Sequence, residues 1–337
     1  MRAVGYRKSL PIDRPDALFD CTVPDPTPRG RDLLVAVKAV SVNPVDTKMR
    51  MHSAPTAGQI KVLGWDAAGV VQAVGEDATL FKPGDRVWYA GSISRAGTNS
   101  ELHLVDERIV GPMPRSLDFA QAAALPLTSI TAWELLFDRF GVAAGKKHAG
   151  EAILIVGAGG GVGSVLVQLA RRLTGLKVIG TAAREVTREW VLELGAHEVI
   201  DHSRPLADEL KRVGVPQVTH VASLTQTDQH FAQIVECLAP QGKLGLIDDP
   251  KAIDVGLLKR KSISLHWELM FTRSLFETAD IQSQHALLSE MARLVDDGWV
   301  RTTATEHFGP INASNLRRAH ALLESGLSRG KIVLEGA

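Results

Sequence analysis

The chain has 337 residues, of which 45% are apolar, 23% are charged and only 5% are aromatic. This length suits about two domains of the usual ~100–200 residues, and the composition excludes disordered and fibrous proteins. Because 38 basic residues balance 38 acidic ones, neither a nucleic acid nor an anionic membrane is expected as the main partner.

Cysteine usage and the N-terminal sequence bear on the compartment. The two cysteines, Cys21 and Cys237, lie far apart, which excludes a disulfide framework and a Cys-rich metal site and favours a reducing compartment. Residues 1–16 lack the apolar region of a signal peptide. The most apolar stretch, 152–170, is interrupted by glycines and is a poor membrane span. The sequence therefore predicts a cytoplasmic protein that does not cross a membrane.

The first third of the chain has the pattern of a β-structure. Segments rich in Val and Leu are separated by Gly and Pro turns, as is typical of strands. We expect strands over residues 31–42, 67–75, 82–91 and 101–110.

From about residue 116 the pattern becomes helical. Residues 116–137 have a helical composition that is broken once, at Pro126. Beyond residue 151, continuous apolar runs alternate with helical patterns, which predicts a doubly wound parallel sheet. The expected strands are 152–156, 177–181, 197–201, 218–223, 243–248 and 262–267, and the main helices are 162–173, 185–194, 284–294 and 316–323.

A glycine-rich segment, GAGGGVG at 157–163, lies between a predicted strand and a predicted helix. Glycines allow a tight turn and let a pyrophosphate approach the backbone, and the helix N-terminus presents unpaired N–H groups to it. With a second strand–helix unit behind it, the segment predicts a dinucleotide-binding loop. The candidate residues are Gly157, Ala158, Gly160, Gly161, Val162 and Gly163.

The end of the next predicted strand indicates which dinucleotide is bound. An NAD site usually has Asp or Glu there to hold the ribose hydroxyls, but this chain has Thr181 and Ala182, followed by Arg184. The missing carboxylate and the nearby guanidinium favour the 2′-phosphate of NADPH. Arg188 is a second candidate for that phosphate, and His202 is expected on the adenosine side. The alternative is that Arg184 is only an exposed residue at a helix start.

Several sequence blocks occur in an order that resembles the medium-chain dehydrogenase/reductase superfamily. The resemblance covers essentially the whole chain and is greatest to the quinone oxidoreductase branch, in particular to the zinc-type alcohol-dehydrogenase-like subgroup. It implies an α/β protein with a GroES-like, β-rich catalytic domain over 1–126 and 269–337, a Rossmann cofactor domain over 127–268, and a homodimer. The blocks are VNPVDTKMR (42–50), GWDAAGVVQAVG (64–75), FKPGDRV (81–87), AAALPLTSITAWELL (122–136) and GAGGGVG (157–163).

The zinc ligands of the related alcohol dehydrogenases are missing. Those enzymes hold a catalytic zinc ion with a Cys, a His and a second Cys. The resemblance places these ligands at Asn43, at Trp65 and around 127–128, none of which can bind zinc in that way, and Trp65 would fill much of the substrate space. The 11 histidines show no H-x-x-x-H pair. No metal site is therefore expected.

Without zinc, a different reaction is expected. Alcohol oxidation needs a Lewis acid to stabilise the alkoxide, whereas hydride transfer from NADPH to a quinone or an α,β-unsaturated carbonyl needs only positioning and stabilisation of the developing oxygen anion. Asn43 is a candidate donor to that oxygen or to the nicotinamide ribose, and Tyr89 is a candidate hydrogen-bond or proton donor. A turn role for Asn43, simple packing of Tyr89 and a proton from solvent remain alternatives.

The remaining candidates follow from the resemblance. Thr131 corresponds to a residue that touches the nicotinamide, and Ser223, Ile247 and Lys331 correspond to positions that line the cofactor cleft. Trp267 lies in an apolar segment that is expected at the substrate pocket or at a dimer interface.

The function expected from these observations is NADPH-dependent reduction of a small electrophilic acceptor, a quinone or an enone. Two alternatives stay open: a zinc-dependent alcohol dehydrogenase with ligands that the family does not use, and a non-catalytic NADPH-binding protein.

Overall fold

The computed structural model describes residues 1–145 and 147–336. It divides into two compact units: unit 1 comprises Met1–Ile130 and Phe271–Ala337, and unit 2 comprises Thr131–Met270. The junctions lie four and two residues beyond the domain ends predicted at 126 and 268. No helix within the described ranges is long and apolar enough to cross a membrane.

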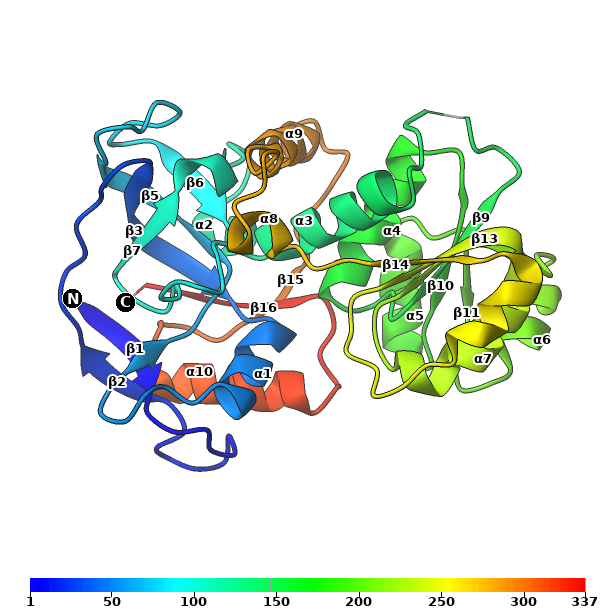
Figure 1. The fold of residues 1–337 in the computed structure, drawn as a ribbon, viewed down its shortest axis with the longest axis horizontal. Helices are drawn as coiled ribbons and strands as arrows, with labels where there is room; N and C mark the ends of the chain where they lie inside the picture. Colours follow the sequence, from blue (N-terminus) through cyan, green and yellow to red (C-terminus); the bar gives the residue numbers. More distant parts are fainter. Residues whose placement is uncertain (146, 337) are drawn as a thin grey trace. The chain divides into compact units, whose positions relative to one another are not determined.

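Unit 1 contains two sheets (Figure 1). The larger has seven strands in the order β15-β16-β3-β5-β6-β8, with β7 also paired to β3, and the smaller has the order β2-β1-β4. The strands are β1 (Arg2–Tyr6), β2 (Phe19–Thr22), β3 (Asp32–Ser41), β4 (Lys61–Val62), β5 (Ala67–Val74), β6 (Arg86–Tyr89), β7 (Leu102–Asp106), β8 (Val110–Pro112), β15 (Ala304–His307) and β16 (Lys331–Glu335).

Short helices connect these strands. α1 begins at a proline, which fits the first helical position because its missing N–H would have no partner there. Pro126 likewise begins α3 rather than interrupting a longer helix. The helices that begin in unit 1 are α1 (Pro44–His52), the 3₁₀ turn η1 (Glu107–Ile109), α2 (Phe119–Ala123), α3 (Pro126–Trp133), α8 (Thr272–Leu275), α9 (Ser283–Asp296) and α10 (Ala313–Glu324).

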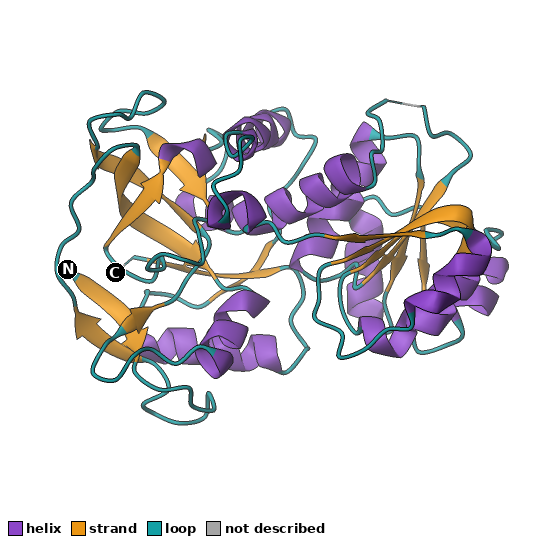
Figure 2. Ribbon diagram, in the orientation of Figure 1, coloured by secondary structure: helices purple, strands orange, loops and turns teal. Residues whose placement is uncertain are grey.

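Unit 2 is built on one six-stranded sheet in the order β11-β10-β9-β12-β13-β14, and every neighbouring pair is parallel, as predicted. Helices cover both faces of this sheet (Figure 2). The elements are the π-helical segment η2 (Glu134–Arg139), β9 (Ala152–Val156), α4 (Gly161–Leu173), β10 (Lys177–Thr181), α5 (Glu185–Glu193), β11 (Glu198–Ile200), α6 (Leu206–Arg212), β12 (Val218–Ser223), α7 (Thr227–Cys237), β13 (Leu238–Leu246), the 3₁₀ segment η3 (Val255–Lys261) and β14 (Ser264–Trp267).

The centre of this sheet is apolar. All five residues of β9 are buried, because a parallel strand covered on both faces has no polar side. The chain runs outward from β9 to β10 and β11 and then returns to β12 on the other side. This reversal between β9 and β12 is the place where doubly wound sheets bind their ligands, outside the carboxyl ends of the strands.

Candidate functional site

The glycine loop predicted from the sequence leaves the carboxyl end of β9. Gly157 has a φ of +84°, a conformation that glycine adopts without strain. Its N–H donates to Thr181 Oγ1 at 3.2 Å, which joins the loop to the end of β10. Gly160 precedes α4, and no side chain caps this helix. The N–H groups of the first turn of α4 are therefore available to an anion.

Two glycines of this loop have different packing. A Cβ atom on Gly163 would lie 2.4 Å from the carbonyl oxygen of Gly157 and 2.6 Å from the Cα atom of Ala158. On Gly160 it would meet only the Gly157 oxygen, at 3.5 Å. Gly163 thus allows close packing of α4 against the loop, while Gly160 keeps the space in front of the helix open. This geometry fits a bound pyrophosphate.

The end of β10 has no acidic side chain at the predicted ribose position. Ala182 is buried, and its N–H donates to Ile200 O at 3.0 Å. Arg184 is exposed immediately before α5. The other candidate, Arg188, donates to the Val199 carbonyl at 2.7 Å and is held at the sheet edge. Arg184 is the more exposed of the two candidates.

The other predicted cofactor residues of unit 2 lie at or near strand ends. Ser223 is buried at the end of β12, where its hydroxyl is 2.7 Å from Thr227 Oγ1. Ile247 follows β13 and His202 follows β11, and both are partly buried. Thr131 is the first residue of unit 2 and is 5% exposed.

Unit 1 brings Asn43 and Lys331 together in a buried network around Asp66. The Asn43 side-chain nitrogen donates to Asp66 Oδ2 at 2.8 Å, and its Oδ1 accepts from Lys331 Nζ at 2.5 Å. Lys331 Nζ also donates to the Val42 carbonyl at 2.6 Å and lies 3.2 Å from Asp66 Oδ2. Lys331, predicted to line the cofactor cleft, is thus a central member of this network.

The network includes two acidic residues that the sequence analysis did not single out. Asp66 Oδ1 accepts the backbone N–H of Leu127 at 2.8 Å, and Asp46 accepts the backbone N–H of Asn43 at 2.6 Å. Burial raises the pKa of Asp66, while Lys331 opposes this increase. Burial also raises the pKa of Asp46, to about 7, and lowers the pKa of Lys331. Both aspartates occur in sequence blocks that carry the family resemblance, NPVD and GWD.

Tyr89 has a partner that limits its role. It is fully buried, its ring stacks on His103, and its hydroxyl lies 3.1 Å from His103 Nδ1. His103 Nε2 lies 2.9 Å from the Ala96 carbonyl, which can only accept, so this nitrogen carries the hydrogen. Burial lowers the pKa of His103 to about 4, so the ring is neutral and Nδ1 accepts a hydrogen bond from the Tyr89 hydroxyl. The Tyr89 hydroxyl proton is therefore already engaged in a hydrogen bond to His103.

The two tryptophan candidates differ in exposure. Trp65 is 1% exposed, its indole N–H donates to Ser92 O at 3.1 Å, and its ring meets Phe271 edge to face. Trp267 is 52% exposed at the end of β14. Trp65 therefore packs inside unit 1, whereas Trp267 offers an apolar surface on unit 2.

Unit 2 also contains a buried acid pair. Arg139 Nε donates to Glu268 Oε2 at 2.8 Å, and Arg139 Nη2 lies 3.8 Å from Glu134 Oε2. Both glutamates are buried. Burial, together with the adjacent Glu134 carboxylate, raises the pKa of Glu268 to about 9. At neutral pH the pair therefore retains a proton that an exposed pair would lose.

This retained proton predicts a pH-dependent stability. An unfolded chain releases the proton near the ordinary pKa of 4.5. The protonated pair therefore makes its full contribution to the stability of the fold below that pH, and this contribution is lost as the pH rises toward 9. Between pH 6 and 8 we expect the pair to lower the free energy of unfolding by up to about 1.4 kcal/mol per pH unit. Glu268→Gln should flatten this slope in urea titrations, whereas Glu236→Gln, on the surface of α7, should leave it unchanged. Equal slopes for all three proteins would contradict the assignment.

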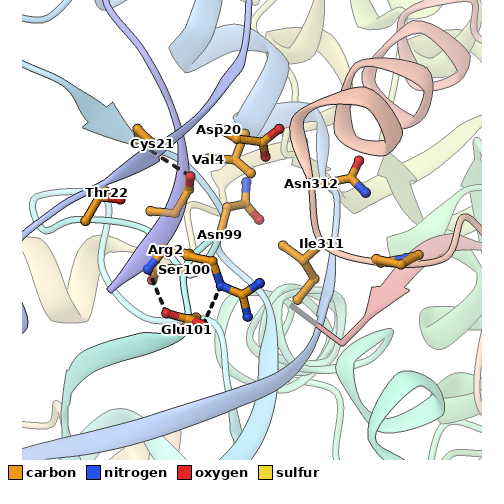
Figure 3. Close-up of a pocket in the computed structure, with 12 residues that line it drawn as sticks. Arg2, Val4, Asp20, Cys21, Thr22, Asn99, Ser100, Glu101, Ile311 and Asn312 are labelled. Atoms are coloured by element: carbon orange, nitrogen blue, oxygen red, sulfur yellow. Dashed lines mark hydrogen bonds and ion pairs between the residues drawn. The ribbon is translucent and has the colours of Figure 1, made fainter.

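Three surface pockets of unit 1 contain none of the predicted site residues. One, of about 470 Å³, is shown in Figure 3, where the Arg2–Glu101 ion pair (2.7 Å) lies beside it. Cys21 and Asn312 also line this pocket. The candidate residues therefore lie outside these pockets, in the glycine loop of unit 2 and in the Asp66 network of unit 1.

Comparison with known proteins agrees with this architecture. Residues 29–115 match the alcohol dehydrogenase GroES-like domain, and residues 194–334 match a zinc-binding dehydrogenase domain. A zinc-type alcohol dehydrogenase-like protein of Staphylococcus epidermidis is 36% identical over 99% of both chains. The chain belongs to the medium-chain dehydrogenase/reductase superfamily, in its quinone oxidoreductase-like branch. The predicted combination of a GroES-like domain and a Rossmann sheet is confirmed.

Solved structures of this superfamily share the fold. A Rhizobium etli protein, provisionally described as a zinc-dependent alcohol dehydrogenase, is 58% identical, with a TM-score of 0.96 over 100% of this chain and 98% of its own. A quinone oxidoreductase of Pseudomonas syringae is 26% identical, with a TM-score of 0.84 over 99% of both chains. The Escherichia coli quinone oxidoreductase, solved with NADPH, has a TM-score of 0.84 over 99% of this chain and 100% of its own at 24% identity, which shows the shared fold. The chain is therefore an oxidoreductase of this superfamily.

The positions predicted to correspond to the zinc ligands of the alcohol dehydrogenases lie together in unit 1. Asn43 and the backbone of Leu127 both donate to Asp66, and the Trp65 carbonyl lies 3.5 Å from Asn43 Nδ2. Among the described residues, no group of three or more His, Cys, Asp or Glu side chains is arranged to hold a metal ion. An amide, an indole and a backbone N–H are poor zinc ligands.

Proposed function

We propose that this chain is an NADPH-dependent reductase that transfers hydride to a quinone or an α,β-unsaturated carbonyl without a catalytic zinc ion. The main support is the Asp66 network, in which the Lys331 ammonium and the Asn43 amide are bound to each other and to Asp66, where the resemblance predicts the family's zinc ligands. A quinone oxidoreductase of Rattus norvegicus is 28% identical over 92% of this chain, which agrees with this substrate class.

Residues of unit 2 account for cofactor binding in this proposal. The N–H groups at the start of α4 hold the pyrophosphate, Gly160 leaves room for it, and Arg184 binds the 2′-phosphate. When bound, NADPH supplies the hydride. Thr131, Ser223 and Ile247 of unit 2 remain predicted neighbours of the cofactor, as does Lys331 of unit 1.

We propose that the second side-chain N–H of Asn43 turns to the acceptor oxygen or to the nicotinamide ribose. Apart from the bond to Asp66, its side-chain nitrogen makes only long contacts, at 3.4 and 3.5 Å, with the carbonyls of Ser41 and Trp65. Because the Tyr89 proton is committed to His103, we propose that solvent protonates the reduced acceptor.

A paired assay tests this function. Chelator-treated protein with its metal content measured is incubated with NADPH or NADH and with a quinone, an enone or, in the reverse direction, simple alcohols. Quinone or enone turnover with NADPH in zinc-free protein is the expected result. Alcohol oxidation that returns only with added zinc would replace the proposal by a zinc-dependent dehydrogenase, and tight NADPH binding without any turnover would favour a non-catalytic binding protein.

Arg184→Ala tests the choice of cofactor. Loss of a charge-assisted hydrogen bond should weaken NADPH binding by about 1.5–3 kcal/mol, while NADH binding changes little. Titration of intrinsic fluorescence with each dinucleotide measures both affinities. Arg188→Ala is the matched control, because Arg188 is bound to the Val199 carbonyl. Equal losses for NADPH and NADH in the Arg184 variant would place the 2′-phosphate elsewhere.

We also propose that the protein forms a homodimer through β14. This strand lies at the edge of the six-stranded sheet, and Trp267 and Leu269 beside it are 52% and 50% exposed. An edge strand with large exposed apolar side chains beside it favours pairing with a second copy. Light scattering should show a dimer for the native chain and a monomer for Trp267→Glu. A native monomer would instead favour the predicted role of Trp267 in a substrate pocket.

A further inference from the structure

Two histidines contact each other near the carboxyl edge of the sheet in unit 2. The rings of His202 and His230 are 6.0 Å apart between centroids and inclined by 79°, an edge-to-face arrangement. His202 follows β11, and His230 lies in the first turn of α7, which follows β12. Both therefore leave the sheet on the side where a doubly wound fold binds its dinucleotide.

The sheet register brings His202 close to the end of β10. Thr181 of β10 pairs with Ile200 of β11, and the Ala182 N–H extends this pairing to the Ile200 carbonyl at 3.0 Å. Arg184 lies three residues beyond Thr181, and His202 lies two residues beyond Ile200. Because neighbouring strands are only about 4.8 Å apart, both side chains begin at the same edge of adjacent strands.

His230, in contrast, is fixed by its helix. The first residue of α7, Thr227, donates its backbone N–H and its hydroxyl to Asp248, at 2.9 and 2.6 Å. The Thr227 hydroxyl also contacts Ser223 at the end of β12. These contacts anchor the start of α7 to the ends of β12 and β13, and His230 is only 8% exposed.

The His230 ring contacts His202 edge to face, and no hydrogen bond to a described residue is formed by its Nδ1 atom. Its Nδ1 atom is buried and has no hydrogen-bond partner among the described residues, and the same is true of His202 Nδ1. Burial lowers the pKa of His230, which keeps its ring neutral near pH 7. A buried neutral ring without a partner for this nitrogen serves its neighbour as a rigid surface.

We propose that His230 is a positioning residue that holds the His202 ring toward the 2′-phosphate of the adenosine, beside Arg184. This inference rests on the proposed NADPH function and assigns to α7 a part in the choice between NADPH and NADH. It requires that the shape of the His230 ring matters and that its nitrogen atoms do not.

Calorimetric binding of cofactor fragments tests this role without measuring turnover. The probes are adenosine 2′,5′-bisphosphate and adenosine 5′-monophosphate, and intact NADPH is the reference. His230→Ala should weaken binding of the bisphosphate about fivefold, the usual size of a coupling between touching residues, and leave the monophosphate unchanged. His230→Phe should restore the native affinity, and adding His230→Ala to His202→Ala should cause no further loss. Gln229→Ala, exposed on the same turn, is the matched control.

The outcomes separate this inference from the proposed function. If His230→Phe binds the bisphosphate as weakly as His230→Ala, or if both fragments lose affinity equally, the positioning role is wrong. If the bisphosphate affinity of His230→Ala equals that of the native protein, the role is also wrong, whereas the NADPH assignment stands. Native protein that binds neither NADPH nor the bisphosphate would overturn the proposed function itself. Thermal unfolding of each variant shows that the fold is retained.

Discussion

Replacing Lys331 by Met is expected to destabilise the folded protein by about 3–5 kcal/mol, because the change leaves buried carboxylates without their cation. Lys331 is 4% exposed and donates to the Val42 carbonyl and the Asn43 amide, beside Asp66. Urea denaturation at pH 7 measures the loss. Lys82→Met, at an exposed position, is the matched control and should change the stability by less than about 0.5 kcal/mol.

A double-mutant cycle separates the charge from the packing of this side chain. Adding Asp66→Asn to Lys331→Met removes both charges. The double variant should therefore recover part of the stability that Lys331→Met alone loses. The Asn43 side chain, bound to both residues, should regain a defined position in the double variant. A loss in Lys331→Met no greater than in Lys82→Met, or additive losses in the double variant, would show that the ammonium does not hold the network together.

Gly163→Ala should reduce the stability of the fold, whereas Gly160→Ala should reduce NADPH binding. At Gly163 the new Cβ atom meets backbone atoms at 2.4 and 2.6 Å, so the variant should lose about 1–3 kcal/mol of stability or more. At Gly160, which has a φ of −76°, the Cβ atom meets one atom at 3.5 Å and the fold should be retained. There the methyl group fills the space proposed for the pyrophosphate, and NADPH binding should fall at least about 100-fold, or ~2.7 kcal/mol.

Thermal unfolding and NADPH titration of the two variants provide the measurements, and each variant serves as the control for the other. The stability defect should appear in Gly163→Ala without any ligand present, and the binding defect in Gly160→Ala should appear at a native melting temperature. Full NADPH affinity in Gly160→Ala would mean that the pyrophosphate does not lie against the start of α4.

Elements with strong local signals were predicted well. The strands expected at 152–156, 177–181 and 218–223 coincide with β9, β10 and β12, because a buried parallel strand is a continuous apolar run. The strand expected at 243–248 instead begins at Leu238 and ends at Leu246. Pro240, Gln241 and Gly242 resemble a turn, and Gln241 has a φ of +64°, yet β13 pairs with β12 across a register shift.

α1 shows the opposite case, because its inward-facing residues are polar. Asp46 and Arg50 of this helix are buried, so residues 44–52 lack the apolar stripe that predicts an amphipathic helix. The partners of Arg50 come from elsewhere in unit 1, since it donates to the Leu10 carbonyl and to Glu324 of α10, whereas Asp46 accepts the N–H of Asn43, the residue just before the helix. Local residues mark the start of this helix, but the distant partners of Arg50 leave no signal in residues 44–52.

The sequence by itself determined the superfamily, the glycine loop and the absence of an acidic residue at the end of β10. The loop and the missing acid are visible in a few consecutive residues, and the superfamily is visible in the order of short sequence blocks. The tertiary structure decided the surroundings of the catalytic candidates. Antiparallel pairing of β16 and β5 with β3 brings Lys331 and Asp66 to Asn43, and packing of His103 engages the Tyr89 hydroxyl. Burying such groups is costly unless every partner is in place, and only the complete fold supplies those partners.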